Sequence, residues 1–173
     1  YTAFFFMYSQ SIFSAIIPLY TIQENLLRLE ELTFIFVAFS GATSLGSILA
    51  GPVSDSIGRK WPIVLGMSCT AFCFVGLYSA DAPITLIIAC LGLGFGTGFF
   101  HPVASALVGD ISTSENRGKA FGFYRLARDL GTFVGPAAAG LISALLGVGS
   151  LFLFNTGLAV LGLFLAIFVV KDH

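Results

Sequence analysis

Charged side chains are scarce in this sequence. Only 10% of its 173 residues are Asp, Glu, Lys or Arg, whereas 57% are hydrophobic, and soluble domains use about 25% charged residues. A soluble fold could not bury so much apolar surface, so the composition excludes an ordinary soluble domain. The net charge is −1 and no basic run occurs. Nothing therefore predicts a nucleic-acid partner, because such a partner is bound through its phosphates.

Cysteine and histidine are also sparse. The three cysteines, an odd number, lie inside apolar stretches and lack the spacing of metal ligands, so we interpret them as small core residues. No pair of carboxylates, His-Glu helix motif or Ser-His-Asp set occurs in these stretches. The sequence therefore predicts no metal site, no cofactor and no enzyme.

What the chain has in abundance is apolar stretches of about 20 residues, each long enough to cross a hydrocarbon core of about 30 Å as a helix. Lipid offers no partner for free backbone groups and an alternating barrel pattern is absent, so helices are expected. We predict an all-α, polytopic membrane protein with a single domain, residues 1–173. Its six transmembrane helices are expected at about residues 2–22, 32–50, 61–80, 84–109, 120–146 and 151–170.

The loops predict the orientation of these helices. The loops after the second and fourth helices and the C-terminal tail carry Arg59, Lys60, Arg117, Lys119 and Lys171. The opposite loops carry only Arg28, beside three glutamates. Because cytoplasmic loops are enriched in Lys and Arg, both termini are expected in the cytoplasm, and the protein in the plasma or inner membrane of the cell.

The segment from Gly51 to Lys60, GPVSDSIGRK, is a dense polar turn between two apolar stretches. Asp55 and Arg59 are four residues apart, so their side chains would meet on one face if the turn is partly helical. Gly51 and Gly58 permit close backbone approach and left-handed dihedral angles. The sequence thus predicts a compact polar connection at the end of the second helix.

A second polar segment, DISTSENRGK, runs from Asp110 to Lys119. Asp110 ends the fourth predicted helix, and Arg117 with Gly118 leads into the fifth. In the predicted topology both cationic loops lie on one side of the membrane. The candidates for a shared charge network are Asp55, Arg59, Asp110 and Arg117. The alternative is an ordinary solvated loop.

The fifth helix begins with a polar cluster, Tyr124, Arg125, Arg128 and Asp129. If this helix starts near residue 119, a rise of about 1.5 Å per residue puts Asp129 roughly 15 Å deep, near the bilayer centre. Charge there is costly unless it is paired or faces water. Arg125 and Asp129 are four apart and can pair, which leaves Arg128 on another face. Alternatively the helix starts later, the arginines extend to the headgroups and only Asp129 needs a partner.

Small residues mark the fourth and fifth helices. Glycine recurs at positions 92, 94, 96 and 98, which permits tight helix crossing or local unwinding. Farther on, the fifth helix has Gly131, Gly135 and Gly140, a smooth face for helix contact. Pro136 among them removes one backbone hydrogen bond and is expected to kink the span.

Two helices carry isolated polar groups. The first has Gln10 and Ser14 near mid-membrane, and Gln10 is the more costly to leave unpaired. The fourth has His101, which titrates near neutral pH if it reaches water. Each is compatible with a cavity wall and equally with a polar contact to a neighbouring helix.

Together these patterns resemble the major facilitator superfamily of secondary transporters. The pattern Gly-x-x-x-Asp-x-x-Gly-Arg-Lys is similar to the family's signature between the second and third helices of each six-helix half. Asp110, followed by Arg117 and Gly118, is similar to the inner loop after its fourth or tenth helix. The stretch GTFVGPAAAG resembles a glycine-proline pattern of its fifth helix, frequent in antiporters, and of its eleventh.

This resemblance implies one six-helix half, made of two inverted three-helix repeats, of a carrier that moves a small solute by alternating access. Proton coupling and export are both compatible with it. It implies a gating role for the two polar segments, from Gly51 to Lys60 and from Asp110 to Gly118. The implied candidates for solute or proton binding are Gln10, Ser14, His101, Arg125, Arg128 and Asp129. The expected partners are the solute, protons, the lipid bilayer, and the missing half or a second copy.

Three features favour the C-terminal half of such a carrier. The first helix lacks the Asp of many members, and the fourth has Ala89 and Cys90 where the family often has Arg. The stretch YRLARDLG is similar to the eleventh helix of bacterial and archaeal members. The alternative function is a membrane packing or regulatory module that derives from such a half and transports nothing.

Overall fold

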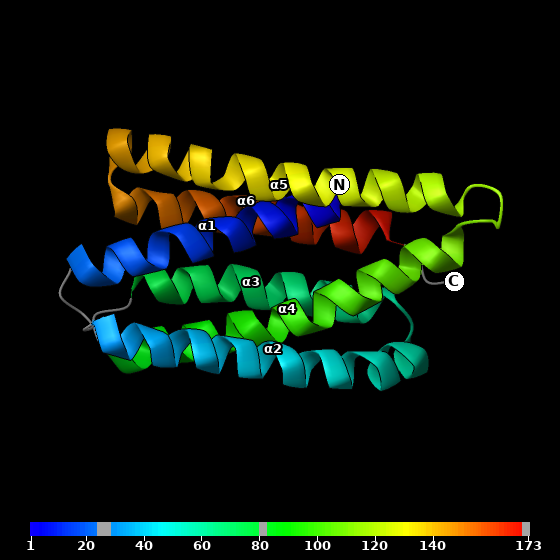
Figure 1. Cartoon of the computed structure of the whole chain (residues 1–173), viewed down its shortest axis with the longest axis horizontal. Coiled ribbons are helices and arrows are strands. Elements are labelled where there is room, and N and C mark those ends of the chain that lie inside the picture. Colours follow the sequence, from blue (N-terminus) through cyan, green and yellow to red (C-terminus); the bar gives the residue numbers. More distant parts are fainter. Residues whose placement is uncertain (24–28, 80–82, 171–173) are drawn as a thin grey trace.

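The computed structural model describes residues 1–23, 29–79 and 83–170, which form six long helices and no strand (Figure 1). Successive helices run in opposite directions along the long axis of the molecule (Figure 1). The helices are α1 (Thr2–Gln23), α2 (Leu29–Ile57), α3 (Lys60–Tyr78), α4 (Pro83–Ile111), α5 (Arg117–Leu146) and α6 (Val148–Val169). The all-α prediction is confirmed.

The main difference from the expected helix bounds is at the polar segment after α2. We expected the second helix to end at residue 50, but α2 continues to Ile57 and takes in most of the segment from Gly51 onward. Only Gly58 and Arg59 separate α2 from α3. Helix bounds are hard to predict here because Ser and Asp remain compatible with a helix once it has begun.

Five helices, α2 to α6, are long and apolar enough to cross a membrane. The sixth, α1, has 22 residues, but the side chains of its last residues lie outside those that the structure describes. Arg28 and Glu24, which we used to predict the orientation, also lie outside the described residues, and Glu30 and Glu31 lie in the first turn of α2 with side chains that the structure does not describe. The apolar helices nevertheless agree with the composition in indicating a multi-pass membrane protein.

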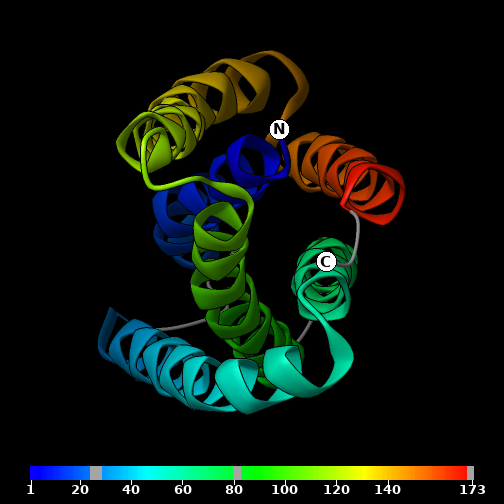
Figure 2. The same cartoon turned by 90° about the vertical axis from the view of Figure 1, so that its right-hand side faces the viewer.

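Viewed from its end, the bundle has α1 and α4 at its centre (Figure 2). Helix α2 packs along α4, and α5 packs along α1. Helices α3 and α6 pack on each other, and each also contacts one central helix, α4 or α1. Exchanging the first three helices with the last three therefore reproduces the main contacts, and α1 and α4 run in opposite directions (Figure 1). This is the arrangement expected of two inverted repeats.

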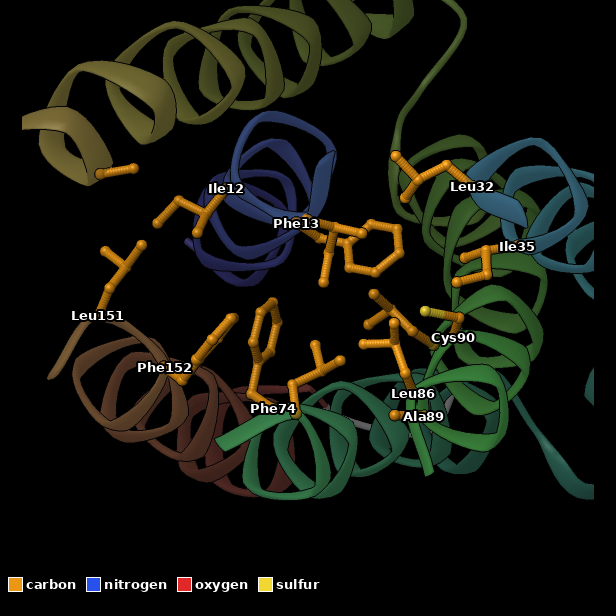
Figure 3. Packing of buried hydrophobic residues seen from close by; sticks show 14 of the residues in the cluster. Ile12, Phe13, Leu32, Ile35, Phe74, Leu86, Ala89, Cys90, Leu151 and Phe152 are labelled. Atoms are coloured by element: carbon orange, nitrogen blue, oxygen red, sulfur yellow. The ribbon is translucent and has the colours of Figure 1, made fainter. Parts of the chain in front are cut away.

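Apolar side chains fill the inside and also cover the outside. One buried cluster, around Phe13, Phe74 and Leu86, points into the space between α1, α3, α4 and α6 (Figure 3). Yet Phe34 is 73% exposed and Phe133 is 79% exposed. Large exposed apolar surfaces are unfavourable in water, so these side chains fit a lipid environment.

The central helix α4 approaches its neighbours through glycines. A Cβ atom on Gly98 would lie 2.7 Å from the backbone nitrogen of Ser47 in α2, and one on Gly46 would lie 2.6 Å from the carbonyl oxygen of Phe95 in α4. On the α3 side, a Cβ on Gly96 would lie 2.7 Å from the Cβ of Cys69. The glycines of α4 thus permit tight crossing within a continuous helix, as small residues do at membrane helix interfaces.

We predict that Gly98→Ala lowers the stability of the protein in its natural full-length chain by about 1–3 kcal/mol, the usual cost of overpacking. The added methyl group meets the backbone of α2, which cannot move aside as a flexible side chain can. Thermal unfolding of the purified protein in detergent measures the effect. Gly140→Ala is the matched control, since its Cβ meets nothing within 4 Å. Equal melting temperatures for the two variants would contradict the prediction.

Candidate functional site

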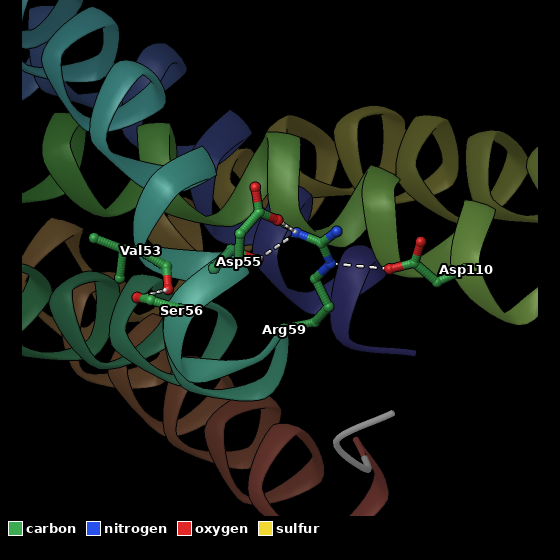
Figure 4. A network of polar contacts seen from close by, with 6 residues as sticks. Val53, Asp55, Ser56, Arg59 and Asp110 are labelled. Carbon is green, nitrogen blue, oxygen red and sulfur yellow. Dashed lines mark hydrogen bonds and ion pairs between the residues drawn. The ribbon is translucent and has the colours of Figure 1, made fainter.

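Arg59 joins three helix ends at one end of the bundle (Figure 4). Its Nη1 donates hydrogen bonds to Oδ1 of Asp55, at 2.7 Å, and to Oγ of Ser54, at 2.8 Å, both on α2. Its Nε donates to Oδ2 of Asp110, near the end of α4, at 2.9 Å. One guanidinium at the start of α3 therefore connects α2 to α4. We call Asp55, Arg59 and Asp110 the Arg59 bridge.

The local sequence explains this geometry. Gly58 has a φ of +89°, a left-handed conformation that side chains disfavour, and it lets the chain turn directly from α2 into α3. Asp55 lies four residues before Arg59 on the last turn of α2, so the i, i+4 pairing that we expected is formed. Gly51 lies within α2, has no left-handed dihedral and would accept a Cβ with nothing within 4 Å. Of the two glycines, the turn requires only Gly58.

The bridge lies at the surface and is held by charge. The side chain of Arg59 is 24% exposed, and those of Asp55 and Asp110 are 69% and 46% exposed. The hydrogen bond to Asp110 raises the pKa of the Arg59 guanidinium, and that to Asp55 adds to this, so Arg59 stays charged at all physiological pH values. Exposed ion pairs are each worth up to about 1 kcal/mol. The Arg59 bridge is therefore strong enough to bias a conformation and weak enough to open.

The other residues of the two polar segments lie apart from the bridge. Arg117 begins α5 and is exposed, and it forms no ion pair with any residue the structure describes. It does line a hollow of about 570 Å³ together with Asp110. Gly118 is exposed in the first turn of α5, and a Cβ there would meet nothing within 4 Å. Lys60 is the first residue of α3. Three of the four expected network residues thus come together, and Arg117 stands beside them.

The charged cluster of α5 is paired differently from our expectation. We predicted an Arg125 to Asp129 pair, but Nε of Arg128 lies 3.3 Å from Oδ1 of Asp129. Arg128 has folded back onto its neighbour in sequence, and both of its hydrogen bonds go to that single oxygen. Arg125 is exposed and has no ion-pair partner among residues 1–23, 29–79 and 83–170. Asp129 is therefore the partner of Arg128 and not of Arg125.

The remaining candidates lie on α1 and α4. Oε1 of Gln10 accepts a hydrogen bond of 3.2 Å from the hydroxyl of Thr97, which joins α1 to α4. Ser14 is exposed and bonds to the carbonyl oxygen of Ser11 in its own helix. His101 lies with its ring edge-on to that of Phe6, 5.5 Å away. It lines a hollow of about 590 Å³ together with Arg128.

The sequence model described as "Major Facilitator Superfamily" matches residues 1–173. The chain belongs to this family. It is 31% identical over 142 residues to "Multidrug resistance protein 2" of Bacillus subtilis (strain 168), which covers 80% of the chain and 34% of that protein. It is 30% identical over 143 residues to "Multidrug resistance protein MdtL" of Vibrio parahaemolyticus, which covers 82% of the chain and 36% of that protein. The chain thus spans about a third of the length of these relatives.

Solved structures support the same fold. A peptide transporter described as POT (E310Q mutant), in complex with alafosfalin, superposes with a TM-score of 0.83 at 21% identity. The match covers 96% of this chain and 36% of that one. Another, from work on proton-dependent oligopeptide transporters, has a TM-score of 0.83 at 18% identity and covers 99% of this chain. At these identities the likeness shows the superfamily fold alone.

The three glycines of α5 differ in how closely they approach α1. A Cβ on Gly131 would lie 2.5 Å from the carbonyl oxygen of Phe4, and one on Gly135 would lie 2.8 Å from that of Tyr8. Both therefore allow α5 to approach α1 closely. Gly140 is exposed and a Cβ there would meet nothing within 4 Å, so the structure gives it no such contact. Helix α5 is continuous through Pro136.

Sequence reasoning missed several polar contacts inside this superfamily bundle. Thr97 and Ser54 bond the two candidates Gln10 and Arg59, yet nothing in their local sequence distinguishes them from other helical hydroxyl residues. Asn155 is buried on α6, and its Oδ1 accepts a hydrogen bond of 3.0 Å from Ser9 on α1. The contacts of Thr97 and Asn155 connect positions more than 80 residues apart. Only the fold brings them together.

We predict that Gly58→Ala lowers the melting temperature, because an alanine with a left-handed φ costs roughly 1–2 kcal/mol. The turn then relaxes and moves Arg59 away from Asp110. Gly51→Ala is the matched control, seven residues earlier, and is expected to be neutral or slightly stabilising. Thermal unfolding of both full-length variants checks this. A Gly58→Ala protein as stable as Gly51→Ala would show that the turn does not depend on glycine.

Proposed function

We propose that this chain forms one six-helix half of a secondary transporter that moves a small organic solute by alternating access. Membership of the major facilitator superfamily supports this, as do relatives named as multidrug resistance proteins. The observation that carries the proposal is the Arg59 bridge. It is a surface ion pair network across three helix ends, which is the kind of contact that can open when helices move.

The missing half, or a second copy of this chain, would pack on the face formed by α1 and α4 and flanked by α2 and α5. Helices α3 and α6 support this, because they pack on each other and lie together on one side of the bundle (Figure 2). Transporters of this kind bind solute at the interface of their repeats, near the bilayer midplane. Gln10 and Thr97, bonded across α1 and α4, would then lie in the cavity wall.

Export is the direction we propose, since several relatives of the chain are named as drug resistance proteins or efflux pumps. His101 and Asp129 are the candidates for proton coupling, and Asp129 has its charge balanced by Arg128.

We infer that the chain is the C-terminal half, on the sequence features of its first, fourth and fifth helices. We further infer that both termini and the Arg59 bridge face the cytoplasm of a cell membrane, by the distribution of Lys and Arg.

Removing one carboxylate of the bridge tests the gating role. Asp55→Asn and Asp110→Asn keep the shape of the side chain and lose its charge, so each releases Arg59 from one ion pair. We expect solute exchange by the full-length protein in proteoliposomes to change roughly fivefold, the factor for about 1 kcal/mol of differential stabilisation. Membrane insertion and expression should stay normal.

The control for this pair is Glu115→Gln, an exposed carboxylate of the loop between α4 and α5 that takes no part in the bridge. Exchange rates of Asp55→Asn and Asp110→Asn equal to that of Glu115→Gln would rule out gating by the bridge. Absence of exchange in every protein, the unaltered one included, would instead favour a packing or regulatory module.

Cysteine labelling tests the orientation. We add a membrane-impermeant maleimide to intact cells. We expect it to label Ser79→Cys at the end of α3 and not Ser114→Cys in the loop before α5. The reason is that Arg59 and Arg117 hold their end of the bundle on the cytoplasmic side. Permeabilised cells should label both variants. Labelling of Ser114→Cys in intact cells would reverse the orientation. The native cysteines lie within helices α3 and α4 and serve as the background.

A further inference from the structure

A groove runs between α4 and α5 from His101 toward the Arg59 bridge. Three adjacent hollows of about 590, 430 and 570 Å³ follow one another along it, and each of them is lined by Ser105. Helices α4 and α5 make few contacts with each other. The walls of this α4–α5 groove are Pro102 and Ser105 on one side and Phe121, Tyr124, Arg125 and Arg128 on the other.

The α5 wall is cationic because of its helical spacing. Arg117, Phe121, Tyr124 and Arg128 follow one another at intervals of four, three and four residues, so they form one stripe of the helix. Arg125 stands beside this stripe. The same stripe continues to Gly131, where α5 meets α1. The part of the stripe that is not covered by α1 is thus the part that carries the arginines.

These positive charges are poorly balanced within the groove. Of the carboxylates in the part of the chain that the structure describes, only Asp110 lines any of the three hollows, and it is already bonded to Arg59. Asp129 pairs with Arg128 from outside the groove, at 3.3 Å and through one oxygen. Arg125 has no described partner. A cation on a membrane helix is costly unless an anion or water meets it.

We propose that the α4–α5 groove binds an organic anion whose carboxylate or phosphate lies between Arg125 and Arg128. The planar guanidinium matches such groups with two parallel hydrogen bonds, and the hydroxyls of Tyr124 and Ser105 add donors. Phe121, Pro102 and Met7 offer apolar surface for the body of the ligand. Hollows of this size fit a drug-sized molecule.

The role of the bound anion rests on the proposed transport function, because the groove opens on the α1 and α4 side, where we place the solute. Its physical claim does not depend on transport. An anion would bind there whether or not the protein moves it across the membrane, so binding and transport can be measured separately.

The test uses the full-length protein in lipid nanodiscs and equilibrium binding of benzoate, with phenyl phosphate as a second anion and benzamide as a neutral molecule of benzoate's shape. We expect both anions to bind in a salt-sensitive manner and benzamide to bind at least tenfold more weakly. Arg125→Gln should lower benzoate affinity at least tenfold, and Arg125→Lys should restore part of it. Lys119→Gln, an exposed cation of the same helix that lines none of the three hollows, should have no effect.

Two results would overturn the anion site. One is equal binding of benzoate and benzamide, and the other is an Arg125→Gln variant that binds benzoate normally. If an acidic side chain of the other half fills the groove instead, benzoate binds in no variant, which also overturns the proposal. Benzoate binding without any solute exchange would leave the anion site standing and remove the transport function. Exchange of a cationic dye with no benzoate binding would support the transport function and overturn the anion site.

Discussion

Close contact between α4 and its neighbours holds the functional parts of this molecule in place. Where α4 crosses α2, the Cα of Gly98 and the backbone around Gly46 are too near for any side chain. In lipid, apolar side chains gain little by leaving their surroundings, so association of helices depends on packing of this kind and on a few hydrogen bonds. Helix α4 in turn carries Thr97, His101 and Asp110. Its glycines therefore set the position of the cavity wall, of the groove and of the Arg59 bridge.

Polar groups are distributed according to what lipid permits. Near the centre of the bundle they are uncharged and bonded to one another, as Gln10 is to Thr97 and Ser9 is to Asn155. Most charges gather toward one end, where water and headgroups are available, whereas Arg128 and Asp129 lie farther along α5 and pair with each other. Asp110 belongs to the Arg59 bridge at that end and also lines the groove. An anion in the groove would therefore lie near a carboxylate that also holds Arg59.

This proximity gives a physical link between the two proposals. Asp110 lines the groove together with Arg117, and its charge is partly neutralised by Arg59. An event that opens the bridge would free Asp110 and change the potential at this end of the groove. Coupling of this kind requires only that the two sites bias one conformational equilibrium.

The sequence by itself determined the features that depend on composition and on contacts close along the chain. Long apolar stretches favour membrane helices, because a helix satisfies all its backbone hydrogen bonds within lipid. The four-residue spacing of Asp55 and Arg59 produced their ion pair. The family, too, was recognisable from short motifs. The placement of both cationic loops on one side even suggested that Asp110 joins the network, as it does.

Only the tertiary structure decided which of several possible partners each side chain meets. Arg128 rather than Arg125 holds Asp129, because a flexible guanidinium can reach an adjacent residue as well as one a turn away. Gly131 and Gly135 face α1, whereas Gly140 lies on another face of α5, because the buried stripe continues at Ala139, four residues after Gly135. The bonds of Thr97 and Asn155, and the groove with its excess of arginines, depend on helices far apart in the sequence. Helical spacing fixes which residues share a face, but only packing fixes what that face meets.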